Sequence, residues 1–391
     1  MLPLDGITVI AVEQAVAAPF ATRQLADLGA RVIKIERPGT GDFARAYDTT
    51  VNGMSSHFVW LNRSKQSLTL DLKHAEAAGV LRSLLARADV FIHNLAPGAM
   101  ERLGFGPDVL RRSHPRLIVC AVSGYGPSGP YRDKKAYDLL VQSETGVLSI
   151  TGSEQEPAKV GISVADISAG MYAFSSVLAA LVHRERTGEG ATLDVSLFDS
   201  LAEWMSYPIY YAYGGTPPPR SGARHATIDP YGPYKAGDGK VVYLGLQNER
   251  EWARFCSDVL QHPELVSDPR FSSNPRRVQH RRELDAAIED AFRMLTAEQV
   301  VARLEQAQIA NARMNTVQEM IDHPQLAARN RWQAVASPAG DVRMLKPPFN
   351  FEGMNAPMNA IPAVGEHTDA ILRELGIEDV TIREWRAAQI V

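Results

Sequence analysis

Short apolar segments alternate with amphipathic ones from residue 7 to about residue 200, and this alternation constrains the fold more than any other feature. We expect strands at residues 7–13, 31–36, 67–72, 89–94 and 117–123, and helices at 19–29 and 74–88. Apolar strands separated by helices are typical of a parallel sheet that helices cover on both faces. Pro19 lies where a first-turn proline is tolerated, and Gly29 lies where the helical pattern ends. The predicted class is α/β.

A second domain is indicated by the composition break GGTPPPRSG at residues 214–222, because three consecutive prolines cannot continue a helix and favour an extended linker. Beyond it we expect a hairpin that turns at residues 237–239 and helices at 248–260, 276–294 and 297–308. The sequence therefore predicts a large α/β domain at 1–215, a smaller α+β domain at 223–325, and a return to the large domain at 326–391.

Composition excludes some partners. The 391 residues are 45% hydrophobic and 22% charged, with a net charge of −4, so no basic excess favours nucleic acid or an anionic membrane. The first residues lack a signal-peptide pattern, and the apolar helix expected near 169–182 is short for a membrane span. Two cysteines form neither a disulfide framework nor a metal motif. We expect a cytoplasmic protein without a metal.

The stretch 158–180 holds the most informative acidic residue. Val160, Ile162 and Val164 alternate as in a strand, and a long apolar helix follows. Asp166 is then expected at the joint. An aspartate there is either the N-cap of the helix or a reactive carboxylate, held charged beside backbone N–H groups.

Two short motifs carry less weight. GYGPSG at 124–129 fits the dinucleotide pattern G-x-G-x-x-G, but no helix signal follows it, so a glycine-rich loop near a ligand is the better interpretation. GISVA at 161–165 approaches a nucleophile elbow, yet Ser163 is expected inside the strand. No H-E-x-x-H, C-x-x-C or Walker A motif is present, which leaves metal-dependent and nucleotide hydrolysis without their usual support.

Two stretches suit phosphate. Lys34 and Arg37 stand beside the glycine-rich turn of VIKIERPGTGD, and Arg102 follows Pro97 on a short predicted helix in NLAPGAMERLG. Each cation also suits an exposed ion pair, which is the commoner role.

Taken together, six segments resemble a known family. They are VIAVEQAVAAPFATRQLADLGARVIKIERPGTGD, NRSKQSLTLDL, NLAPGAMERLGFG, VSGYGPSGPYRDKKAYDLLVQSETG, GISVADISAGMYA and GEHTDAILRELG. In this order they resemble the class III CoA-transferases, the group typified by formyl-CoA transferase, and they cover nearly the whole chain. The resemblance implies a two-domain α/β subunit whose large domain has a Rossmann-like sheet, and an interlocked homodimer.

The resemblance also implies site residues. Asp166 corresponds to the catalytic aspartate, and Tyr137 to an active-site tyrosine. The positions that correspond to CoA-binding residues are Ala17, Arg37, Leu70, Asn94, Leu95, Ala99, Arg102 and Lys135. Coenzyme A and its acyl thioesters would be substrates, and the reaction would need neither metal nor ATP, because an aspartyl anhydride and a thioester are comparably activated.

Departures from the formyl-CoA transferase pattern concern the acids. Val16 replaces a glutamine, and a glycine-rich flap is absent before the second-domain strands. The shorter segment resembles relatives that act on dicarboxylates with succinyl-CoA as donor. Arg220, Arg224 and His225 would then meet a distal carboxylate, or else lie in a solvated linker.

Two alternatives remain. An α-methylacyl-CoA racemase of the same superfamily needs two acid/base groups, and its histidine corresponds here to Tyr137, a much weaker base. A CoA-binding protein without turnover is the other alternative, and the presence of both Asp166 and Tyr137 disfavours it.

Overall fold

The computed structural model describes residues 1–349 and 351–391 and contains a six-stranded sheet of order β3-β2-β1-β4-β5-β6, in which every neighbouring pair is parallel. The strands are β1 (Thr8–Val12), β2 (Arg31–Glu36), β3 (Lys65–Thr69), β4 (Val90–His93), β5 (Ile118–Ser123) and β6 (Thr192–Ser196). This is the strand order of a doubly wound Rossmann-like sheet. The predicted α/β class is confirmed, and the five predicted strands correspond to β1 to β5, although β3 begins before the expected range 67–72 and already ends at Thr69.

The chain divides into two compact units. The first comprises Met1–Thr145, Gly161–Met205 and Gln325–Val391, and the second Gly146–Val160 and Ser206–Pro324. Compared with the predicted ranges, the second unit also takes in residues 146–160 and begins before the proline linker. The physical reason lies in hydrogen bonds. The Gly222 N–H donates to the Gly152 carbonyl, and the Arg220 guanidinium donates to carbonyls of residues 149–154.

Helices pack on both faces of the sheet in the first unit. They are α1 (Ala17–Asp27), η1 (Phe43–Ala46), α2 (Ser56–Leu61), α3 (Ala75–Leu85), α4 (Ala99–Arg102), α5 (Pro107–Ser113), α6 (Asp138–Glu144), α8 (Val164–Thr187), α9 (Leu197–Trp204), α17 (Thr368–Glu374) and α18 (Asp379–Ala387). A hairpin of β10 (Trp332–Val335) and β11 (Val342–Leu345) precedes the last two, and α16 (Pro324–Ala328) starts at the unit boundary.

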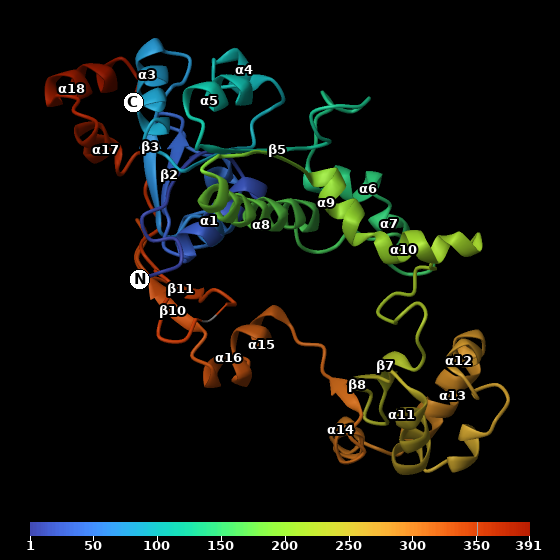
Figure 1. Cartoon of the computed structure of the whole chain (residues 1–391). Helices are drawn as coiled ribbons and strands as arrows, with labels where there is room; N and C mark the ends of the chain where they lie inside the picture. The colour runs from blue at the N-terminus through green and yellow to red at the C-terminus, as the bar shows by residue number, and fades with distance from the viewer. Residues whose placement is uncertain (350) are drawn as a thin grey trace. The chain divides into compact units, whose positions relative to one another are not determined.

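One apolar cluster joins one face of this sheet to its helices. Ile10, Ile33 and Phe91 on the strands are buried together with Leu81 of α3 and Leu372 of α17. On the other face α1 packs against α8, and the two helices lie side by side in Figure 1. Alternate strand residues therefore point into two separate layers, as expected for a sheet that is covered on both sides.

The second unit is built around an antiparallel sheet of β7 (Tyr231–Lys235), β8 (Val241–Gly245) and β9 (Ala310–Ala312). Its helices are α7 (Val147–Ile150), α10 (Ser206–Tyr211), η2 (Ala212–Gly214), α11 (Glu249–Arg254), η3 (Phe255–Leu260), η4 (Pro263–Val266), α12 (Asn274–Gln279), α13 (Arg281–Phe292), α14 (Ala297–Gln306) and α15 (Val317–Ile321). Trp252, Phe255 and Phe292 are buried in its own core. The predicted hairpin and helices are confirmed, although the helix expected at 276–294 is interrupted at His280.

The strand expected before Asp166 is absent. Residues 158–163 have no regular secondary structure apart from a bend at 161–162, and α8 already begins at Val164. α8 is also longer than the apolar helix that was expected there. Its 24 residues are long and apolar enough to cross a membrane by length and composition alone, and 44% of its most apolar window is buried. Ala169, Ala173 and Val177 contribute to the buried side, so α8 is a core helix of its unit.

Candidate active site

A cleft of about 1020 Å³ lies in the first unit, at the ends of four parallel strands. It is lined by Glu13 and Gln14 after β1, by residues 36–42 after β2, by residues 69–74 after β3 and by Leu95 after β4. In doubly wound sheets ligands bind outside the carboxyl ends of the strands, near the point where the strand order reverses. That point is here between β1 and β4, so the cleft occupies the expected place.

Both acidic and basic side chains line this cleft, and the basic ones include three without an ion-pair partner among the described residues. Arg37, Lys73 and Arg102 line it, and no ion pair involves any of the three within the described part of the chain. Arg386 also lines it but is bound to Asp369. Unpaired cations around a cleft suit an anionic ligand that carries several phosphates.

Five of the eight predicted CoA-binding residues line the cleft: Arg37, Leu70, Leu95, Ala99 and Arg102. The short turn before α4 brings one of them into place. Gly98 has a φ of +74°, and a Cβ at this position would lie 2.8 Å from Nη1 of Arg102. Glycine adopts this φ without strain, whereas a larger residue would be strained and would also displace the end of the Arg102 side chain.

The other three predicted CoA-binding residues, Ala17, Asn94 and Lys135, are not among the residues that line the cleft. Ala17 is buried at the start of α1. The Asn94 side chain binds the backbone of Gln14: its Oδ1 accepts the Gln14 N–H at 2.9 Å, and its Nδ2 donates to the Gln14 carbonyl at 2.8 Å. Asn94 therefore shapes the cleft through Gln14. Lys135 is exposed on the loop after β5.

Lys34, which the sequence placed beside a phosphate-binding turn, is unavailable to any ligand. Its side chain is completely buried, and its Nζ lies 2.8 Å from Oδ2 of Asp42 and 3.4 Å from Oε1 of Glu13. Lys65 donates to the same Glu13 oxygen at 2.7 Å. Burial opposes ionisation of Glu13, but the charges of Lys65 and Lys34 together outweigh it, and the pKa of Glu13 is lowered.

This buried network supports the loop that leads from β1 into α1. Asp42 accepts the N–H of Ala15 at 3.1 Å, and Ala15 has a φ of +59°, which is uncommon for a residue with a Cβ. Asn94 holds the preceding residue, Gln14, as described above. The loop is thus tied to β2 and β4, and its strained conformation is maintained by partners from both sides.

Asp166 lies in the first turn of α8 and is not its N-cap, which corrects the prediction. The N-cap position belongs to Ser163, whose side chain makes no capping bond. The carboxylate comes instead from Asp138: its Oδ1 accepts the N–H of Ala165 at 2.8 Å and that of Asp166 at 3.4 Å. The side chain of Asp166 therefore makes no capping hydrogen bond, and no ion pair includes it within the described residues.

The charge of Asp166 is disfavoured. Burial is the first cause and the negative charge of Asp138 the second, and together they raise the pKa of Asp166 to about 7. Both causes act in the same direction because nearby protein atoms displace water and no cation compensates. A carboxylate with this pKa is partly protonated at neutral pH and a stronger base than an ordinary aspartate.

Tyr47 is a residue of this region that the sequence interpretation missed. Burial raises its pKa to about 12, and the charges of Asp42 and Asp166 and the nearby Tyr137 add to this effect. Its ring contacts those of Phe43 and His57 at centroid distances of 5.7 and 5.4 Å. Tyr47 follows the turn RPGTGD by only a few residues, but nothing in its local pattern distinguishes it from a surface tyrosine.

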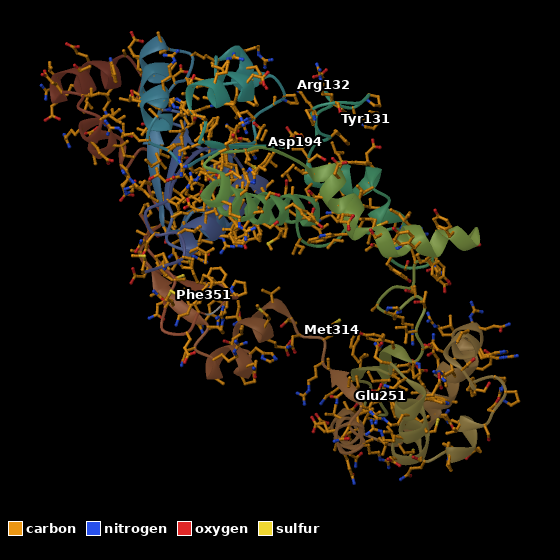
Figure 2. All side chains as sticks on the ribbon, viewed as in Figure 1. Tyr131, Arg132, Asp194, Glu251, Met314 and Phe351 are labelled. Atoms are coloured by element: carbon orange, nitrogen blue, oxygen red, sulfur yellow. The ribbon has the colours of Figure 1, made fainter. Side chains whose placement is uncertain are left out.

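Tyr137 immediately precedes Asp138 and is the N-cap residue of α6, with 66% of its surface exposed. The loop before it is held close to β5, because a Cβ at Gly124 would lie 2.3 Å from the Cβ of Ala136. Lys134, rather than the predicted Lys135, is bound here: it pairs with Glu144 and lies 4.1 Å from the Tyr131 ring centroid. Figure 2 shows Tyr131 and Arg132 at the outer end of this loop.

The three residues suggested for a distal carboxylate are engaged inside the second unit. Arg220 donates to backbone carbonyls, and Arg224 pairs with Asp285 at 2.9 Å while its guanidinium lies 4.9 Å from the Tyr234 ring. The His225 ring stacks on Tyr231 at 5.3 Å. The partners of Arg220 and Arg224 come from segments far along the chain, which the local sequence could not reveal, whereas Tyr231 lies near His225 in sequence.

Comparisons with known proteins agree on one family. The family model described as CoA-transferase family III matches residues 4–368. An acetyl-CoA:oxalate CoA-transferase of Acetobacter aceti is 35% identical and covers 95% of each chain. The human succinyl-CoA:glutarate CoA-transferase is 30% identical over the whole of this chain and 90% of its own length.

A solved structure gives the same answer for the fold. A CAIB/BAIF family protein from Brucella suis superposes with a TM-score of 0.83 at 31% identity, over 96% of this chain and 99% of that one. Sequence and structure thus match along nearly the full length of both chains, and the cleft residues Arg37, Lys73 and Arg102 lie inside the matched region. The chain is an enzyme of the transferase class and belongs to CoA-transferase family III.

Proposed function

We propose that this enzyme moves CoA from an acyl-CoA donor, succinyl-CoA or a similar thioester, to a free dicarboxylic acid, with Asp166 as the covalent nucleophile. The carrying observation is the environment of Asp166. Its carboxylate lies on the first turn of a long core helix, has neither a cation nor a capping role, and has a pKa raised to about 7. Relatives whose names specify glutarate or oxalate as acceptor support the choice of dicarboxylates.

The reaction would proceed in balanced steps. Asp166 attacks the thioester carbonyl and the carbon–sulfur bond breaks. The CoA thiolate departs, and the acyl group is joined to Asp166 as a mixed anhydride. The thiolate then attacks the aspartyl carbonyl, which releases the donor acid and forms an aspartyl-CoA thioester. The acceptor carboxylate attacks the aspartyl-CoA carbonyl, which releases the CoA thiolate and forms a second mixed anhydride. The thiolate then attacks the acceptor's carbonyl, so the new acyl-CoA forms and Asp166 is released as a free carboxylate. Each step exchanges one activated acyl group for another, so none needs an external energy source.

The residues around the cleft would hold CoA. Arg37, Lys73 and Arg102 have no internal ion pair and would bind its phosphates, while Leu70, Leu95 and Ala99 offer apolar surface. Tyr137 and Tyr47 would lie near the reacting carboxylate, because the charge of Asp166 and the nearby Tyr137 both contribute to the raised pKa of Tyr47. Lys135, exposed on the loop before Tyr137, is retained as a proposed CoA contact.

Trapping the covalent intermediate tests this assignment. Hydroxylamine should convert the aspartyl anhydride or thioester formed with succinyl-CoA into a hydroxamate at residue 166, which peptide mass spectrometry would locate. The Asp166→Asn variant should form none, lose exchange by at least 1000-fold and bind CoA with unchanged affinity. Asp108→Asn is the matched control, because Asp108 also occupies a first helical turn but is exposed. A fully active Asp166→Asn enzyme would refute the proposal.

The acids are tested with a matrix of donors and acceptors. We expect exchange from succinyl-CoA to glutarate, malate or oxalate to exceed exchange to monocarboxylates of equal length. Incorporation of solvent deuterium at the α-carbon of an acyl-CoA, without any acceptor acid and without hydroxamate formation, would instead support a racemase. Binding of CoA with neither reaction would support the non-catalytic alternative.

We infer a homodimer as the working form. Within the second unit, five side chains between residues 207 and 213 are each at least 42% exposed: Tyr207, Ile209, Tyr210, Tyr211 and Tyr213. Exposed apolar clusters of this kind are typical of protein interfaces. Light scattering should give twice the mass of one chain, and a monomer mass at micromolar concentration would contradict the inference.

A further inference from the structure

Asp138 connects the two residues that the proposed function places at the reaction centre. It is the first residue of α6 and follows Tyr137 directly. It also accepts the N–H of Ala165 at 2.8 Å and, at 3.4 Å, the N–H of Asp166. One carboxylate therefore links the backbone beside Tyr137 to the backbone of Asp166, across 28 positions of sequence.

The carboxylate itself is held in place on its other side. Oδ2 of Asp138 accepts a hydrogen bond from Nε2 of Gln142 at 2.7 Å, and Gln142 is completely buried. Both oxygens thus have fixed donors, so the orientation of Asp138 is set by α6 and that of the α8 start is set by Asp138. A helix cap normally comes from the residue just before the helix, whereas here Ser163 provides none.

The position of Asp138 also brings a second negative charge close to Asp166. The groups that act electrostatically in this region are Asp138 and Tyr137 from the side of α6, Tyr47 from the segment after η1, and Asp42 from the turn after β2. None of them is a cation. The negative charge of Asp138 opposes ionisation of Asp166.

We propose that Asp138 is a positioning residue for acyl transfer: its carboxylate locks the first turn of α8 to the Tyr137 segment and so fixes where the Asp166 side chain starts. This inference rests on the proposed role of Asp166. The bond to the α8 N–H groups supplies the position, and the charge supplies a more basic carboxylate. These two effects are separable by substitution, because asparagine retains an acceptor oxygen without the charge, whereas alanine removes both.

The test uses the full-length enzyme and follows kcat against pH. For Asp138→Asn we expect the acid limb to move to lower pH by about 0.5–1 unit, with kcat at pH 7 within about threefold of the wild type. For Asp138→Ala we expect a 10- to 100-fold lower kcat, a CoA Kd within about twofold, and partial rescue in Asp138→Glu. Asp133→Asn, an exposed carboxylate on the adjacent loop, is the matched control.

Two readouts keep the outcomes distinct. NMR titration of the Asp166 carboxyl measures its pKa without any activity, and a lower value in Asp138→Asn is expected. If Asp166→Asn remains active, the proposed function fails. If Asp166→Asn is inactive but Asp138→Asn has an unchanged titration and Asp138→Ala is no slower than Asp133→Asn, the positioning role is refuted. Thermal unfolding identifies a variant that has lost its fold, and Asp138→Asn then decides alone.

Discussion

At the scale of single residues, the environment of Asp166 is built to disfavour its charge. The side chain is partly buried, Asp138 adds a like charge, and the tyrosines nearby supply no positive charge. Cations without an ion pair among the described residues lie elsewhere, since Arg37, Lys73 and Arg102 line the cleft. Their absence around Asp166 keeps the carboxylate basic, which an attacking group needs.

A stability measurement tests this environment directly. The folded pKa of Asp166 is raised to about 7, above that of an unfolded aspartate, so the native state binds the proton more tightly. The protonated side chain therefore favours folding at low pH, and this contribution is lost as pH rises through 7. Because asparagine carries no charge, Asp166→Asn should be more stable than the wild type at pH 8, by roughly 1–2 kcal/mol.

The same comparison at pH 4 supplies the control, because Asp166 is protonated in the native wild type there and the two chains should unfold almost alike. Urea denaturation at both pH values measures the difference. An Asp166→Asn variant that is less stable at pH 8 would show that the carboxylate is not destabilised in the fold.

At the scale of elements, the contact of α1 with α8 sets how closely the first turn of α8, which carries Asp166, approaches α1. Gly170, one turn after Asp166, lies against α1: a Cβ there would be 2.7 Å from the Ala17 carbonyl oxygen and 3.0 Å from Cβ of Phe20. The predicted CoA residue Ala17 thus contributes through packing of the two helices. A residue larger than glycine forces these helices apart.

We expect Gly170→Ala to destabilise the enzyme by about 1–3 kcal/mol, because the obstacle is backbone and cannot rotate away. Gly79→Ala is the matched control. Gly79 lies within α3, and nothing stands within 4 Å of its added Cβ, so this substitution should stabilise by about 0.5–1 kcal/mol. Chemical denaturation of both variants checks the pair. Equal effects of the two substitutions would show that the α1–α8 contact is looser than the structure has it.

At the scale of the whole molecule, the doubly wound sheet explains why loops far apart in sequence share one cleft. Residues after β1, β2, β3 and β4 meet there because parallel strands end at the same edge. A ligand in the cleft contacts all of them at once and stabilises the folded unit through mass action.

CoA at 100 times its Kd should therefore stabilise the enzyme by about 2.7 kcal/mol. At the same CoA concentration, Arg102→Ala should reduce this gain by about 1–2 kcal/mol, since one charge-assisted contact to phosphate is lost. Differential scanning calorimetry with and without CoA measures the gain in stability for the wild type and for the variant. Arg132→Ala is the control, because Arg132 is exposed and pairs with its neighbour Asp133. A gain that is unaffected in Arg102→Ala would exclude Arg102 from the CoA site.

The sequence by itself determined the α/β class, the approximate positions of the first five strands and the family, whereas the domain ranges and the role of Asp166 remain predictions. These follow from periodicity within short windows and from six motifs in order, and neither depends on which segments meet in space. The roles of individual polar residues depend on that. Lys34 reads locally as a phosphate ligand, but β1, β3 and the turn after β2 surround it with Glu13, Lys65 and Asp42.

Only the tertiary structure decided which carboxylate caps α8 and which one makes no capping bond. Local rules assign the cap to Asp166, yet Asp138 supplies it from another helix. Capping needs an acceptor within about 3 Å of an orphan N–H, and a residue far along the chain satisfies this once α6 packs on α8. The geometry that frees Asp166 is thus a property of the packed helices, and no window of sequence around residue 166 contains it.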